Sequence, residues 1–222
     1  MALARLKFLK GAQLLNISST TYDTQLKALL SAVSAFVDRY CRVVNDDGTG
    51  SLEKTTYTSE YYTGDETKKL FLRNFPVSSI ASVFIWDGSD SYDQENSGHY
   101  ALFDKRYIYF PALGQEGNST WGAWPCYPNG IKVSYVAGYD TTNWDTADVP
   151  VGTGQTFAVP ADLEYAVAVL AALAWQKGRQ DLGLLGKTGL SVGPQSLSIE
   201  SYEQGMPPDV KAILMNYKRA NI

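Results

Sequence analysis

The sequence predicts an α+β protein: a helical layer of about three helices with an inserted antiparallel β module. Apolar residues recur every three or four positions in the segments 21–44 and 207–219, which is the period of a helix with one buried face. Residues 160–179 open with helix-start residues and are apolar almost all round between 166 and 175. Residues 52–139, between the segments 21–44 and 160–179, are rich in Thr, Tyr and β-branched residues and are broken by turn residues, as short strands are. The 222 residues, 45% of them hydrophobic, suffice for one domain with a substantial core, so we expect residues 1–222 to form a single domain.

The first predicted helix spans residues 21–44. Its apolar stripe includes Leu26, Val33 and Val37, which lie at helical spacing. Cys41 falls on the same face, where a small buried hydrophobic residue is expected. Turn residues at 45–48 then end the helix.

The inserted module is predicted to contain short strands joined as antiparallel meanders, because no helical segment separates them. The predicted strands are 55–62, 70–72, 80–86, 100–102, 107–110 and 131–135. Long loops are expected at 87–99, 112–130 and 140–158.

The second predicted helix, 160–179, begins at Pro160, and it is apolar almost all round between residues 166 and 175. In a chain of this size, such a helix leaves one side for another subunit, and Val169 and Leu173 are candidates for that contact. The run is about half a transmembrane span, so we expect a buried helix and no membrane contact. The third predicted helix, 207–219, begins at two prolines.

Composition argues against most catalytic chemistry. The chain has one His and two Cys, and no phosphate-binding loop, dinucleotide fingerprint or serine-nucleophile motif survives inspection of its spacing. We therefore expect no enzyme, no catalytic residue, no cofactor and no metal site, and we rank a hydrolase third among the functions considered. The net charge of −4 supplies no basic field for nucleic acid.

The aromatic loop 112–130 has two interpretations. Trp121 and Trp124 could stack on the rings of a carbohydrate, or they could fill a small β layer or a subunit interface, where Trp is enriched. The first interpretation gives the second-ranked function, an aromatic-rich β module that binds a carbohydrate or a receptor. The second makes Trp121 and Trp124 candidates for the subunit interface.

Several local strings occur in an order that is similar to one protein family. They are Val37-Asp38-Arg39-Tyr40-Cys41, Phe75-Pro76-Val77-Ser78-Ser79-Ile80, Trp124-Pro125 before Ile131-Lys132-Val133-Ser134-Tyr135-Val136-Ala137-Gly138-Tyr139, Val159-Pro160-Ala161-Asp162-Leu163, and Pro208-Asp209-Val210-Lys211-Ala212-Ile213-Leu214. Over about residues 20–220 the chain resembles the head–tail connector (adaptor) proteins of long-tailed bacteriophages and gene transfer agents. The three long loops exceed the compact form of that family.

The resemblance implies a structural role in the neck of a virion, assembled in the host cytoplasm. It implies a homo-oligomeric ring, usually of twelve subunits, that docks under the portal protein. Such a ring extends the DNA channel and offers a platform to the next neck or tail-completion protein. Duplex DNA would pass through it without specific binding.

The C-terminal helix is the expected attachment element to the portal. Its candidate residues are Val210, Ile213, Leu214, Tyr217 and Lys218. The first four have the spacing of a helix that docks in a groove. The same stripe would also suit the core of the subunit itself, and the sequence leaves both possibilities open.

Overall fold

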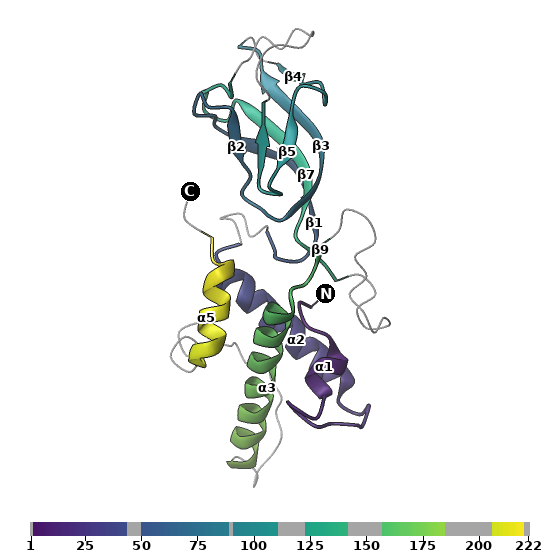
Figure 1. Cartoon of the computed structure of the whole chain (residues 1–222). Coiled ribbons are helices and arrows are strands. Elements are labelled where there is room, and N and C mark those ends of the chain that lie inside the picture. Colours follow the sequence, from purple (N-terminus) through teal and green to yellow (C-terminus); the bar gives the residue numbers. More distant parts are fainter. Residues whose placement is uncertain are drawn as a thin grey trace. The chain divides into compact units, whose positions relative to one another are not determined.

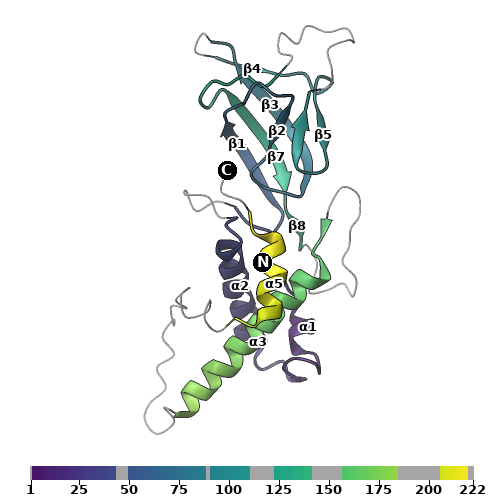
Figure 2. The same cartoon turned by 60° about the vertical axis from the view of Figure 1, so that its left-hand side comes forward.

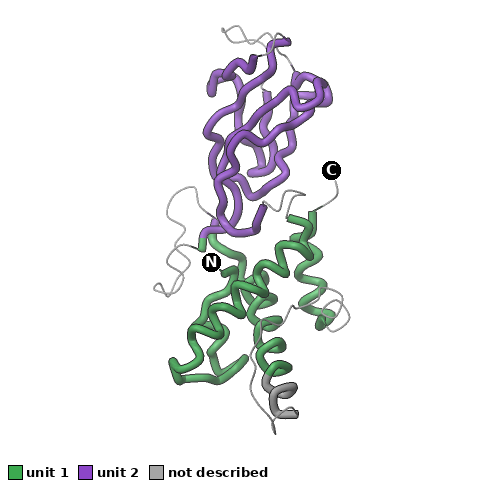
Figure 3. The backbone as a smooth tube through the Cα atoms, turned by 180° about the vertical axis from the view of Figure 1, so that it is seen from behind, with its two compact units in different colours: residues 1–49, 141–151, 158–221 green, residues 50–140, 152–157, 222 purple. Residues whose placement is uncertain are grey.

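The computed structural model divides into two compact units, each described here by itself (Figure 3). The structure describes residues 2–43, 50–88, 91–110, 123–141, 157–184 and 206–219, with side chains omitted for 179–184. The helical unit combines the two ends of the chain, and the β unit consists mainly of residues 50–140. The α+β class predicted from the sequence is confirmed.

The helical unit is organised around its longest helix, α3 (Ala161–Leu184) (Figures 1 and 2). Helices α1 (Leu6–Lys10), α2 (Asp23–Tyr40) and α5 (Pro208–Tyr217) all pack against α3. The three predicted helices are therefore present, and the short helix α1 is an addition that five residues could not signal by periodicity.

Helix α2 ends four residues earlier than the sequence suggested. Arg42 takes a left-handed conformation with φ 55°, and the Val43 amide donates to the Asp38 carbonyl at 2.9 Å. This local turn diverts the chain before residue 44. Cys41 is buried as the apolar pattern indicated, and Val43 is buried as well. Helix α3 instead runs five residues beyond the predicted end at 179.

A buried ion pair fixes the N-terminal segment to the first turn of α3. Arg5 donates to Glu164 from its backbone N (3.1 Å), Nε (2.8 Å) and Nη2 (3.0 Å), and the Glu164 residue is only 5% exposed. A carboxylate removed from water in this way needs several donors, and one arginine supplies them all. Leu3 and Leu9, on either side of Arg5, are thereby held in the core.

The β unit consists mainly of two antiparallel sheets. The first has the order β1-β7-β3-β4, from β1 (Thr55–Tyr62), β7 (Ile131–Ala137), β3 (Val77–Trp86) and β4 (Tyr92–Gln94). The second has the order β2-β6-β5, from β2 (Lys69–Phe71), β6 (Tyr107–Tyr109) and β5 (Ala101–Phe103).

The six predicted strands are present and antiparallel, but their arrangement is not a simple meander. Strand β7, the last of the large sheet in sequence, lies between β1 and β3 because its alternate residues Ile131, Val133 and Tyr135 complete the buried face. Strand β4 occupies part of the predicted loop 87–99. The pair β8 (Tyr139–Asp140) and β9 (Phe157–Ala158) lies at the two ends of the predicted loop 140–158.

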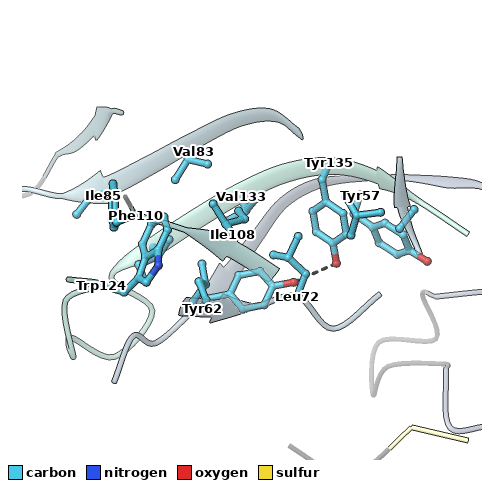
Figure 4. Packing of buried hydrophobic residues seen from close by; sticks show 14 residues of the cluster. Tyr57, Tyr62, Leu72, Val83, Ile85, Ile108, Phe110, Trp124, Val133 and Tyr135 are labelled. Carbon is cyan, nitrogen blue, oxygen red and sulfur yellow. Dashed lines mark hydrogen bonds between the residues drawn. The ribbon is translucent and has the colours of Figure 1, made fainter. Parts of the chain in front are cut away.

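One hydrophobic cluster fills the space between the inner faces of the two sheets (Figure 4). Trp124 and Phe110 pack with ring centroids 4.1 Å apart, and the Trp124 indole N–H donates to the Lys68 carbonyl at 3.2 Å. This hydrogen bond satisfies the polar atom of an indole that is otherwise withdrawn from water.

A polar network crosses the same core. The hydroxyls of Tyr62 and Tyr135 donate to Glu60 Oε2 at 2.5 and 2.6 Å, and Asn74 Nδ2 donates to Glu60 Oε1 at 3.2 Å. Burial is the main cause that raises the pKa of both phenols, so both remain protonated donors near neutral pH. The network links β1 and β7 to the segment before β3, which buried apolar contacts alone would position less uniquely.

Gly138, directly after β7, occupies a position that requires glycine. Its φ is +104°, and a Cβ there would lie 2.4 Å from the Glu53 carbonyl oxygen. The close approach lets the Tyr139 amide donate to the Leu52 carbonyl at 2.7 Å. The segment that follows β7 thus lies beside the segment that leads into β1.

Two substitutions of the same type on α3 test its orientation. Leu170 is 1% exposed and Leu173 is 39% exposed. Leu170→Asp should lower the free energy of unfolding by at least about 3 kcal/mol, since truncation of a buried leucine alone costs about 2–5 kcal/mol and an unpaired carboxylate adds to that. Leu173→Asp should change it by only about 0.5–1 kcal/mol, mostly through the helix propensity of Asp. Urea unfolding of both variants measures the difference, and equal losses would contradict the orientation of α3.

Candidate assembly interface

Helix α3 carries an apolar stripe on the side that its own unit leaves uncovered. Tyr165 and Leu173 are 40% and 39% exposed, and Val169 between them is half-buried. The spacing i, i+4, i+8 puts the three side chains on one face of the helix. We call these three residues the α3 stripe.

The opposite side of α3 explains why the stripe cannot turn inward. Leu163, Val167 and Leu170 are fully buried, so the core already fixes the rotation of the helix. Val169 and Leu173 therefore lie at the surface, as a contact with another subunit requires. The contact itself remains a prediction. Tyr165 was missed, although its position four residues before Val169 was a usable signal.

Helix α5 divides the predicted portal residues into two groups. Val210 and Leu214 are fully buried in the helical unit, where α5 packs on α3. They offer no surface to a portal, and this part of the prediction is wrong: the stripe closes the subunit's own core. Ile213 is half-buried and remains a candidate.

The remaining two candidates on this segment are already engaged within the helical unit. The Tyr217 hydroxyl donates to Asp162 Oδ1 at 2.7 Å, and the Lys218 ammonium lies 5.1 Å from the centroid of the Tyr40 ring. Their exposed parts stay accessible. The most exposed large hydrophobic side chain of α5 is Met215, at 53%, which the apolar pattern did not indicate because it falls outside the stripe.

The end of α5 is tied to the end of α2 by the backbone. The Arg219 amide donates to the Cys41 carbonyl at 2.9 Å, and the Cys41 thiol lies 3.7 Å from the Leu214 carbonyl oxygen. Burial raises the pKa of the Cys41 thiol to about 12, so the group is a protonated, buried side chain, as the apolar pattern predicted. Helix α5 is thus a docked part of the helical unit.

Trp124 does not belong to a surface site. It is 0% exposed and lies in the core of the β unit, so it presents no face to a neighbouring subunit or to a sugar ring. Trp124 lies in a predicted loop, and a loop has no sequence period from which the burial of this side chain could have been inferred. Trp121 lies outside the described residues.

Groups suited to catalysis or metal binding are sparse in the part of the chain that the structure describes. Among those residues, no three His, Cys, Asp or Glu side chains gather in a way that could hold a metal ion. The His99 ring contacts the Glu95 carboxylate in the segment between β4 and β5. Over the same described residues, no helix has the length and apolarity needed to cross a membrane.

Solved structures provide similar chains at low identity. A chain from the neck of an empty gene transfer agent particle, computed with C6 symmetry, shares 16% identity and a TM-score of 0.47, covering 97% of this chain and 88% of its own. A chain from the virion of a native gene transfer agent particle shares 16% identity at a TM-score of 0.43, covering 93% and 82%. A chain from the neck of a native particle, computed with C12 symmetry, shares 15% identity at 0.41, covering 93% and 94%.

Sequence comparison gives the family directly. No curated protein matches the sequence. The family model described as "Head completion protein" matches residues 12–220, nearly the whole chain, which confirms the resemblance to head–tail connector proteins. The chain belongs to the head completion protein family.

Proposed function

We propose that this protein is a non-enzymatic component of the virion neck, which forms a ring under the portal protein and joins head to tail. The ring continues the DNA channel and offers its other side to the next neck or tail-completion protein. Membership of the head completion protein family supports this role. The observation that carries the ring is the α3 stripe, an apolar surface on a helix whose other side is fully buried.

The stripe fits a contact between copies for two reasons. Contiguous exposed apolar side chains on a soluble protein mark interaction surfaces more often than isolated ones do. A closed ring also joins two different surfaces of each subunit, so one stripe per subunit meets a different surface of its neighbour. We expect twelve copies, the usual number in the family that the sequence resembles.

Leu173→Asp should separate folding from ring formation. The side chain is exposed, so the variant should fold with a nearly unchanged melting temperature. A carboxylate in the centre of an apolar contact is left without a partner, and we expect at least about tenfold fewer rings and joined particles. Negative-stain images of assembled particles would count both.

The matched control for this experiment is Gln25→Asp, which adds the same charge at an exposed polar position of a different helix, α2. This variant should assemble normally. Normal assembly of Leu173→Asp would remove the α3 stripe from the ring interface.

The portal contact is assigned to the exposed side of α5. Ile213, Tyr217 and Lys218 border this side, and Met215 projects from it. A flexible methionine adapts to an apolar partner surface without a fixed shape. Because Val210 and Leu214 anchor the helix in its own unit, the contact requires no detachment of α5.

Met215→Asp should abolish binding to portal-bearing heads while the protein stays folded. Its matched variant is Leu214→Asp, one residue earlier and fully buried, which should destabilise the fold by several kcal/mol for the reason given for Leu170. Sedimentation of the protein with isolated heads measures the binding. Co-sedimentation of Met215→Asp at the wild-type level would show that the portal contacts another surface.

Duplex DNA should pass the ring without being gripped. The chain carries a net charge of −4, and each phosphate neutralised by Lys or Arg would add salt-dependent affinity and friction. We expect the free protein to bind duplex DNA no better than the nonspecific range of about 10⁻⁴–10⁻⁶ M at physiological salt. A gel-shift assay that gave nanomolar binding would contradict the conduit and indicate a role in DNA processing.

A further inference from the structure

The small sheet of the β unit exposes an aromatic row on its outer face. Phe71, Tyr107 and Phe103 are directly opposite one another on β2, β6 and β5. Ring centroids are 5.3 Å apart for Phe71 and Tyr107, and 5.9 Å apart for Tyr107 and Phe103. The two phenylalanines are 50% and 56% exposed, although they have no polar atom to gain from water. We call this row the small-sheet face.

The large sheet carries a second aromatic group on its outer face. Tyr61 on β1 and Phe84 on β3 both pair with Lys132 on β7, and Tyr92 on β4 completes the group. The Lys132 ammonium lies 4.7 Å from the Phe84 ring centroid and 4.9 Å from that of Tyr92. Tyr61 is 45% exposed and packs on Tyr92 at 6.1 Å. These four residues form the large-sheet face.

The two faces point in opposite directions. Each sheet turns its inner residues, such as Ile108 and Val133, into one shared core (Figure 4), so the outer residues lie on opposite sides of the β unit. A twofold dimer would need one self-complementary patch. Two different aromatic patches on opposite sides suit a subunit that has a neighbour on each side, as in a closed ring.

We propose that the small-sheet face of one copy binds the large-sheet face of the next copy. This inference rests on the proposed ring and adds to it a second contact, made by the β units and independent of the α3 stripe. The occupant of each face is a second copy of this chain. Tyrosine, which is present on both faces, is among the residues that most often dominate the energy of such contacts.

Charge at the rims of the two faces favours this pairing. Beside the small-sheet face, Lys69 on β2 and Lys105 and Arg106 in the β5–β6 turn outnumber Asp104, and all four are exposed. At the β3–β4 end of the large-sheet face, Asp87 is exposed, whereas Asp93, the strand partner of the buried Ile85, projects to the other side of β4. Opposite charges at the rim select the orientation and the partner face more than they add affinity.

The size of the small-sheet face explains why it needs the ring. Three strands of three residues span only about 10 Å by 10–14 Å, given about 3.4 Å per residue and about 4.8 Å between strands. A stable pair buries about 800 Å² on each partner, far more than such a face covers. The contact should therefore form within an assembled ring and not between free subunits in dilute solution.

Site-specific photo-crosslinking in assembled particles tests the pairing. The full-length protein would carry p-benzoylphenylalanine in place of Phe103 on the small-sheet face, or in place of Tyr61 on the large-sheet face. We expect adducts between two copies, with the Phe103 probe attached near the large-sheet face and the Tyr61 probe near the small-sheet face. Replacement of Tyr22, a similarly exposed tyrosine of the helical unit, is the matched control and should give no adduct on either face.

A double variant, Phe71→Ser with Phe103→Ser, should reduce the adduct of the Tyr61 probe at least about tenfold, since it removes two aromatic contacts. Its melting temperature should not fall by more than a few degrees, because both side chains are half exposed. Undiminished Tyr61 adducts would overturn the pairing.

The remaining outcomes separate this inference from the proposed function. Rings that form normally, with probe adducts to a different protein or within one chain, would overturn the pairing and leave the ring in place. A sugar-binding outcome is also distinguishable. If the wild-type protein binds soluble N-acetylglucosamine oligomers and the double variant does not, while rings form without adducts between copies, the small-sheet face binds a sugar and the pairing is overturned. Absence of any ring from particles that contain the wild-type protein would overturn both proposals.

Discussion

The structure of the helical unit depends on the apolar circumference of α3. Between residues 166 and 175 the helix has almost no polar side chain, so whichever side it buries, another apolar side remains. Helices α1, α2 and α5 cover one side, and Arg5 on Glu164 holds the N-terminal segment against its first turn. Because these elements cover only one side of α3, the side with Tyr165, Val169 and Leu173 stays at the surface. A helix needed only for the core would not need apolar side chains at Tyr165 and Leu173, because a polar residue at these exposed positions would cost little in the isolated subunit.

The β unit follows the same physical rule with a different period. Alternation along each strand sends one set of side chains into the core around Trp124 and the other set outward. On most solvated sheets the outward set is polar. Here it includes Phe71, Phe103 and Tyr61, each between 45% and 56% exposed. Both units therefore keep apolar side chains at positions where folding does not require them, and only 19% of all residues are charged.

Sequence patterns were sufficient for the longer elements and insufficient for the shortest ones and for the partners of each strand. The helices and the six strands were predictable because each has four or more residues in one period, or a short run between turn residues. Strand β4 was not, because its three residues are too few to show a period, although it pairs with the neighbouring β3. The position of β7 was not either, since pairing between distant segments leaves no local trace. The stripe of α5 shows the limit most clearly: Val210 and Leu214 have the spacing of an anchor and of a core equally, and only the packing against α3 decides between them. For Trp124 the sequence left a β layer, a subunit interface and a sugar-binding surface open, because its loop has no period from which burial could be inferred, and the structure places it in the β layer.

Weak contacts spread over both units suit a protein that assembles on a template. In the proposed ring, the α3 stripe and the sheet faces are each small, and association of two free copies must offset the loss of translational and rotational freedom with only a few side chains. Once a portal holds neighbouring copies side by side, the same contacts act at high effective concentration and their energies add around the ring. Closure then removes the exposed apolar ends that an open chain of copies would keep. A larger interface would stabilise free oligomers away from the portal, and the modest exposed fractions of Tyr165 and Leu173 are consistent with selection against that outcome.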